Sequence, residues 1–166
     1  MPEDDVDRIV SAWRRERPEL DVTPLEILSR ISRLARRLDL ARGAAFSEHG
    51  LDGWEFDVLS ALRRAGKPYE LSPGQLVAQT LVTSGTMTNR VDRLLARGFV
   101  ERQPDPRDRR GVIVRLTPDG MRTVDAALDD LLAHERELLA ELPTGRRTDL
   151  ADQLRILLTP FERSSP

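Results

Sequence analysis

The chain has 166 residues, the size of one ordinary domain, and it contains no cysteine, which excludes disulfide bonds, thiolate metal sites and a cysteine redox switch. Its formal net charge is only −2, but the charge is uneven: residues 84–115 hold eight arginines against four acids, and residues 116–166 hold six arginines against ten acids. No apolar run approaches the roughly 20 residues of a membrane span, and the acidic start is unlike a signal peptide, so we expect a cytoplasmic protein without membrane association.

Helical periodicity dominates the first part of the chain, where leucine, alanine, arginine and acidic residues outnumber strand formers. Helices are predicted over residues 3–17, 23–48 and 53–65. Trp13 lies on the apolar side of the first helix. Thr23 and Glu26 have the spacing of a capping box, which predicts the start of the second helix.

Residues 72–97 have the pattern of a helix-turn-helix. A short helix is predicted over residues 72–78, opened by a capping box of Ser72 and Gln75. A tight turn leads to a second helix over residues 84–97, and Gly98 ends it. Two helices joined by such a turn are typical of DNA-binding proteins.

The second helix of this pair has an apolar face and an opposite face that is small, polar and cationic. Such a face suits the major groove, because Asn pairs with adenine, Arg with guanine, and Thr methyl groups contact thymine. The first turn also offers free N–H groups to a phosphate. The predicted DNA contacts are Ser84, Gly85, Thr86, Thr88, Asn89 and Arg93. An ordinary solvated helix face is the alternative.

Two strands follow, over residues 99–102 and 112–116, with a proline-rich, charged tip between them. Arg107, Arg109 and Arg110 lie on this tip, and arginines on a thin hairpin can enter a narrow minor groove. One of them could instead pair with Asp108 and hold the tip in shape. A helix-turn-helix followed by a charged hairpin predicts a winged helix.

Two further helices are predicted over residues 117–142 and 145–161, separated by Pro143. The whole is therefore mainly α-helical with a small β-hairpin wing. We expect a winged helix-turn-helix domain over residues 51–116, flanked by helical segments over residues 1–48 and 117–166. The apolar stripes of the flanking helices fit a helical dimer interface, and they fit a monomeric core equally well.

Residues 105–120 read DPRDRRGVIVRLTPDG, and this stretch resembles the wing signature of the MarR family, D-x-R-D-x-R followed by V-x-L-T-x-x-G. The order of the predicted helices also matches, so the resemblance covers almost the whole chain. It implies a homodimer held by the first and last helices and bound to double-stranded DNA at a pseudo-palindromic operator. Two recognition helices then enter consecutive major grooves about 34–36 Å apart. Repression is the commoner mode of the family.

The chain is also similar to the urate-responsive branch of that family, which has an extra N-terminal helix with a tryptophan. The four ligand positions of that branch fall on Trp13, Asp57, Arg90 and Arg102. The resemblance implies a pocket for a small anionic effector such as urate. From the residues themselves, Asp57 lies on an otherwise apolar side of its helix, where a carboxylate needs a partner, and Arg102 is the expected one.

The expected mechanism starts with a ligand anion that binds Arg90 and packs on Trp13. Its charge disturbs the Asp57–Arg102 pair and shifts the recognition helix. Aconitate- or citrate-like carboxylates, or another aromatic effector, suit the same arginines. Trp13 as a packing anchor and a purely structural Asp57–Arg102 pair are the alternatives.

Two rival functions compete with that of a ligand-responsive regulator. One is a ligand-blind architectural DNA-binding protein, which has no use for Asp57 in an apolar stripe. The other is an enzyme, which the sequence disfavours because it has no nucleophile elbow and no phosphate loop. His49 and His134 lie far apart without other ligands at metal spacing. We therefore predict no catalytic residue, no metal and no cofactor.

Overall fold

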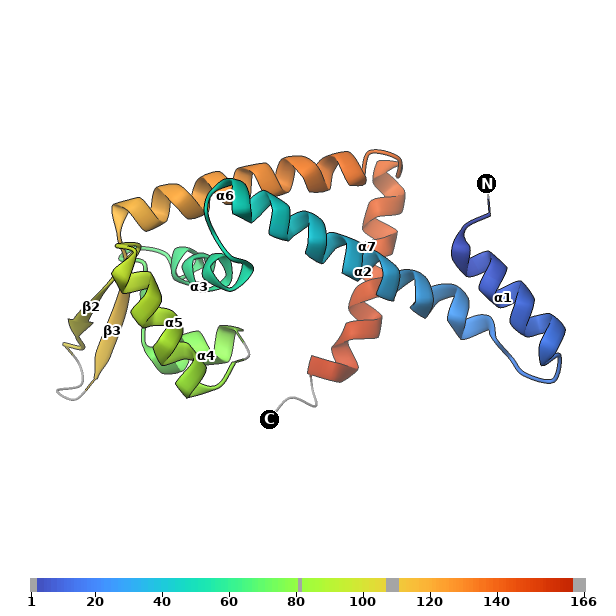
Figure 1. Cartoon of the computed structure of the whole chain (residues 1–166), viewed down its shortest axis with the longest axis horizontal. Coiled ribbons are helices and arrows are strands. Elements are labelled where there is room, and N and C mark those ends of the chain that lie inside the picture. The colour runs from blue at the N-terminus through green and yellow to red at the C-terminus, as the bar shows by residue number, and fades with distance from the viewer. Residues whose placement is uncertain (1–2, 81, 107–110, 163–166) are drawn as a thin grey trace.

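The computed structural model describes residues 3–80, 82–106 and 111–162. In chain order its elements are α1 (Asp5–Glu16), α2 (Thr23–Glu48), α3 (Gly53–Arg64), β1 (Glu70–Leu71), α4 (Pro73–Thr80), α5 (Ser84–Ala96), β2 (Val100–Pro104), β3 (Val112–Leu116), α6 (Pro118–Leu138) and α7 (Thr144–Glu162). Figure 1 shows α3, α4, α5 and the strands gathered at one end of the molecule. The long helices α2 and α6 run from there towards α7, and α1 lies at the far end of α2. The predicted fold, mainly helical with a small β wing, is confirmed.

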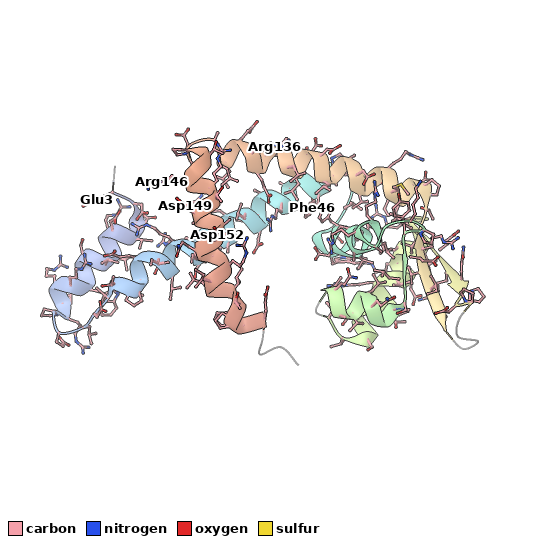
Figure 2. All side chains as sticks on the ribbon, turned by 180° about the vertical axis from the view of Figure 1, so that it is seen from behind. Glu3, Phe46, Arg136, Arg146, Asp149 and Asp152 are labelled. Carbon is pink, nitrogen blue, oxygen red and sulfur yellow. The ribbon has the colours of Figure 1, made fainter. Side chains whose placement is uncertain are left out.

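The hydrophobic core lies at the compact end, where α3 is packed against α4, α5, α6 and β3. The largest fully buried apolar side chains include Leu51, Leu59, Leu62, Leu76, Met87 and Leu94. Each such side chain contributes about 1.5–3 kcal/mol by leaving water. Phe46 lies at the end of α2 that faces this core (Figure 2), and its ring stacks on that of Phe56 with centroids 4.1 Å apart. The core therefore fixes α5 on a rigid support.

The strands form a three-stranded antiparallel sheet in the order β1-β3-β2. The predicted hairpin is present, with Val100 opposite Leu116 and β2 extended to Pro104. Strand β1 was not predicted. It is only two residues long, and its Glu70 accepts from Arg115 on β3, with the side-chain atoms 2.6 Å apart. A strand this short is specified by that cross-strand partner rather than by its own sequence pattern.

The capping box predicted for the start of α4 is present. The amide of Ser72 donates to the Gln75 side chain at 2.8 Å, and the Gln75 amide donates to the Ser72 hydroxyl at 3.3 Å. Thr117 caps α6 by accepting the amide of Gly120 at 3.0 Å. Helix α6 ends at Leu138, earlier than the predicted boundary at residue 142, and the chain turns before Pro143.

The capping box predicted for Thr23 and Glu26 is wrong. The residue that caps α2 is Val22, and the Thr23 amide donates to the Asp21 carboxylate at 3.0 Å. Glu26 instead pairs with Arg14 of α1 at 2.5 Å. The Asp21 carboxylate therefore accepts an amide of the first turn in place of the threonine side chain, and the helix still begins at Thr23, as predicted.

Helix α1 is held on the first half of α2 by a small apolar cluster and an ion-pair network. Val6 and Val10 are packed with Val22. Arg30 of α2 donates to Asp4 at 2.8 Å and to Asp7 at 2.6 Å. The hydrogen bond from Arg30 is the main reason that the pKa of Asp4 falls to about 2, with backbone N–H groups adding to it.

Helix α7 has no buried side chain within the single chain. Its exposed large apolar side chains are Leu150, Ile156, Leu157, Leu158 and Phe161. Together with α1 and α2 it borders a groove of about 1200 Å³ that is lined by Ile27, Leu34, Leu40 and Leu157 among others. In Figure 2 the polar side chains of Arg146, Asp149 and Asp152 are spread along the same helix. In the described part of the chain, no helix combines the length and apolarity needed to cross a membrane.

Candidate nucleic-acid interface

The two faces predicted for α5 are present in the structure. Met87, Val91 and Leu94 are buried against the core. The opposite face carries Ser84, Gly85, Thr86, Thr88, Asn89 and Arg93, all exposed. Thr83 caps the helix by accepting the amide of Thr86 at 3.3 Å. The apolar spacing of the sequence therefore orients this helix and leaves its polar face open to solvent.

Hydroxyl groups on this face are already engaged by their own helix. Thr88 donates to the carbonyl oxygen of Ser84 at 3.1 Å, and the hydroxyl groups of Thr83 and Thr86 lie 2.9 Å apart. Their methyl groups remain available for apolar contact. The capacity for specific hydrogen bonding therefore rests mainly on the Asn89 amide and the Arg93 guanidinium, which match adenine and guanine in the major groove.

Arg93 is not isolated on this face. Its guanidinium lies 4.7 Å from the centre of the Trp54 ring on α3, and its Nη2 lies 3.7 Å from an Asp52 carboxylate oxygen. Arg90 lies over the same ring at 5.5 Å. The contact of α3 with α5 that brings both arginines over Trp54 is a tertiary feature, which the spacing of residues along the sequence does not reveal.

A backbone hydrogen bond continues the pairing of β2 and β3 beyond Pro104 and Val112. Strands β2 and β3 converge on the tip, and the amide of Asp105 donates to the carbonyl oxygen of Gly111 at 2.9 Å. The predicted groove-binding residues Arg107, Arg109 and Arg110, and the predicted wing acid Asp108, lie outside the described residues. Their DNA contacts remain predictions from the sequence.

The predicted ion pair between Asp57 and Arg102 is wrong. Arg102 on β2 pairs with Asp92 on α5, with Nη2 and Oδ1 2.8 Å apart. This pair ties the first wing strand to α5. Spacing along the chain did not reveal that Asp92 on α5 lies closer to Arg102 than Asp57 on α3 does.

Asp57 is exposed in the single chain and, among the described residues, forms no ion pair. Its pKa is raised chiefly by desolvation, and the attraction of Arg90, Arg64 and Arg42 opposes that effect only in part. Asp57 is therefore a carboxylate within electrostatic reach of three arginines but held by none at contact distance. Of the four predicted ligand residues, only Asp57 and Arg90 lie close enough in the single chain for the charge of one to lower the pKa of the other.

Trp13 lies apart from the other predicted ligand residues. It is 46% exposed on α1, which is packed on the start of α2. Figure 1 shows α1 at the end of the molecule opposite α5. The groove beside α1 is lined by none of the four predicted ligand residues. One chain by itself therefore does not assemble Trp13, Asp57, Arg90 and Arg102 into one pocket.

Comparisons with known proteins fit this geometry. A model of the MarR family matches residues 49–111, which run from the end of α2 into the wing. The HTH-type transcriptional regulator PecS of Dickeya dadantii is 37% identical over 159 residues, which cover 96% of this chain and 93% of PecS.

Two solved structures share the arrangement of helices and strands. A mutant of MarR from E. coli, complexed with operator DNA, matches with a TM-score of 0.67 and 28% identity over 84% of this chain and 99% of that chain. Bordetella bronchiseptica BpsR, whose DNA binding is regulated by 6-hydroxynicotinic acid, matches with a TM-score of 0.59 and 29% identity over 77% of this chain and 98% of that chain.

Proposed function

Since the chain belongs to the MarR family of transcriptional regulators, we propose that it binds a pseudo-palindromic operator as a homodimer and represses transcription until a small anionic ligand releases it. The observation that carries the proposal is the exposed polar and cationic face of α5, which stands beside the β2–β3 wing on a rigid core. Residues 51–116 read the DNA, and the helices of residues 1–48 and 117–166 hold two copies together.

Helix α7 supports the homodimer. None of its apolar side chains is fully buried within the single chain, although each would contribute about 1.5–3 kcal/mol if it were. The groove beside it offers apolar side chains of α2, including Leu34 and Leu40, in the same region. A second copy of the chain supplies matching apolar helices, so α2 and α7 of two copies bury one another.

We propose that the ligand anion binds beside Asp57 and Arg90. Arg90 belongs to α5, so a ligand that pulls on it moves the recognition helix, and the Arg102–Asp92 pair carries the movement to the wing. The ligand charge also repels the Asp57 carboxylate. Release of DNA then needs only a difference of a few kcal/mol in ligand affinity between the two states.

Trp13 reaches this site from the partner in our proposal. Helix α1 lies beyond α7 at the end of α2 (Figure 1), so in a dimer joined through α2 and α7 it extends towards the second copy. The indole face then covers a planar anion such as urate. The regulation of BpsR by 6-hydroxynicotinic acid supports a small aromatic acid as the ligand class. Citrate- and aconitate-like carboxylates are the second candidate class.

Two variants test the assignment of α5. Arg93→Ala should abolish preferential binding to DNA from upstream of the chain's own gene while the ligand still raises the melting temperature. Arg90→Ala should keep DNA binding largely intact but blunt the release by urate. Fluorescence anisotropy and thermal denaturation measure the two effects. Loss of DNA binding in Arg90→Ala with the urate thermal shift preserved would overturn the ligand site.

A further inference from the structure

One aromatic ring on α3 lies against two arginines of the recognition helix. The guanidinium groups of Arg93 and Arg90 lie 4.7 Å and 5.5 Å from the centre of the Trp54 ring. The arginines are three residues apart, so they stand on one flank of α5 and meet the same partner. The indole N–H donates to an Asp52 carboxylate oxygen at 3.1 Å, which fixes the ring at its other edge.

Stacking restrains an arginine without using its hydrogen-bond donors. A guanidinium that lies on an aromatic face keeps its N–H groups in the plane of the cation, where they can still reach a base or a phosphate. Arg93 fits this description, because its side chain is 59% exposed and its distance of 3.7 Å to Asp52 is longer than a hydrogen bond. The ring therefore limits the rotamers of Arg93, and among the described residues its N–H groups keep only the long contact with Asp52.

We propose that Trp54 is a positioning residue for DNA recognition, which holds the Arg93 guanidinium in the orientation that pairs with DNA. Trp54 then raises DNA affinity without itself touching DNA, because Arg93 loses less conformational freedom on binding. This inference rests on the proposed function, since it assigns to Trp54 a role in the same interface. The opposite role, in which the ring holds Arg93 away from DNA, predicts the opposite change in affinity.

The test compares Trp54→Leu and Trp54→Phe with the wild-type chain. Fluorescence anisotropy measures the Kd for a duplex from upstream of the chain's own gene and for a scrambled duplex of equal length. Trp54→Leu removes the aromatic face and should weaken binding to the upstream duplex by about threefold to tenfold. Trp54→Phe keeps an aromatic face and should lose about twofold or less. Thermal denaturation of each variant separates this effect from a loss of folding.

A double-mutant cycle shows whether Trp54 acts through Arg93. At low salt, where the remaining phosphate contacts keep binding measurable, Trp54→Leu should cause no further loss of DNA affinity in an Arg93→Ala background. In an Arg90→Ala background, it should keep its full effect. Arg93→Lys gives a second route that does not disturb the partly buried ring: it keeps the charge but loses the planar stacking. It should weaken binding at least as much as Trp54→Leu does, because lysine also lacks the paired donors of the guanidinium.

Each result has a defined meaning. Tighter or unchanged binding by folded Trp54→Leu, an equal loss in Trp54→Phe, or an undiminished loss in the Arg93→Ala background would overturn the role of Trp54. A wild-type chain that binds both duplexes equally would overturn the proposed function, and the inference with it. Preferential wild-type binding that Trp54→Leu leaves unchanged overturns the inference alone.

Discussion

The guanidinium of Arg97 at the end of α5 donates to the buried carboxylate of Glu55 in the first turn of α3. Glu55 is 2% exposed, and its carboxylate also accepts the amide of Asp52 at 2.9 Å. The second Arg97 nitrogen donates to the carbonyl oxygen of Gly50 at 2.7 Å. One arginine therefore fastens the recognition helix to the segment that joins α2 and α3.

Arg97→Ala should lower the free energy of unfolding by about 1–3 kcal/mol, because it leaves a buried carboxylate without its cation. The loss should not exceed that range, because the Arg97 side chain is 37% exposed and water weakens its attraction to Glu55. Arg122→Ala is the matched control: it breaks an exposed pair with Asp119 within α6 and should cost about 0.5 kcal/mol or less. Urea unfolding measures both. Equal losses in the two variants would show that the Glu55–Arg97 pair stabilises the chain no more than an exposed ion pair does.

Gly120→Ala should destabilise the chain. A Cβ at this position would lie 2.1 Å from the carbonyl oxygen of Phe99, and backbone cannot move aside as a flexible side chain does. Such overpacking costs about 1–3 kcal/mol. Gly43→Ala, in α2 with nothing within 4 Å of the added carbon, should instead raise stability by about 0.5–1 kcal/mol. Thermal denaturation should therefore show opposite signs, and the same sign for both would contradict the packing described for α6.

Asp57→Asn should leave stability unchanged or raise it at neutral pH. Desolvation raises the pKa of Asp57 in the folded chain above its ordinary value of 3.8. A raised folded pKa favours the protonated form, so its contribution to stability is present below pH 3.8 and is lost as the pH rises through the folded pKa. The difference in the free energy of unfolding between Asp57→Asn and the wild type should narrow as the pH falls through the folded pKa of Asp57. Urea unfolding across this pH range would contradict the account if Asp57→Asn were less stable at neutral pH.

Helix α1 should loosen from α2 in acid. The folded pKa of Asp4 is lowered to about 2 from an ordinary 3.8, so its contribution is present above pH 3.8 and is lost as the pH falls through about 2. A Trp54→Phe chain leaves Trp13 as the single tryptophan, whose fluorescence reports on α1.

Two arginine variants of α2 test this acid transition. Arg30→Ala removes the hydrogen bonds to Asp4 and Asp7, and the loss of the bond to Asp4 should move the transition up towards pH 3.8. Arg33→Ala removes only the contact to Asp5, 3.1 Å away, and should leave the transition in place. A transition that Arg30→Ala does not move would show that Asp4 does not hold α1 on α2.

The sequence predicted most of the helices because their signals are local. Apolar spacing placed Met87, Val91 and Leu94 on the buried side of α5, and side-chain acceptors marked the starts of α4 and α6. Strand β1 was missed because two residues carry no periodicity and depend on Arg115 across the sheet.

The ion pairs were harder to predict because they depend on which elements meet in space. Arg102 reaches Asp92 rather than Asp57, and Glu26 reaches Arg14 rather than the start of its own helix. The stacking of Arg93 on Trp54 has the same origin, since it follows from the packing of α3 against α5. Trp13 was grouped with Asp57, but in one chain α1 lies at the opposite end of the molecule from α5, as Figure 1 shows.

The most direct test of ligand-released DNA binding is an anisotropy titration of the wild-type chain bound to DNA from upstream of its own gene. Urate is added first, then citrate and aconitate, and sodium chloride at matched ionic strength is the control because salt alone weakens phosphate contacts. The account predicts release by one of these anions at a defined midpoint and none by the matched salt. A tight complex that none of the three anions disturbs beyond the salt control would contradict it.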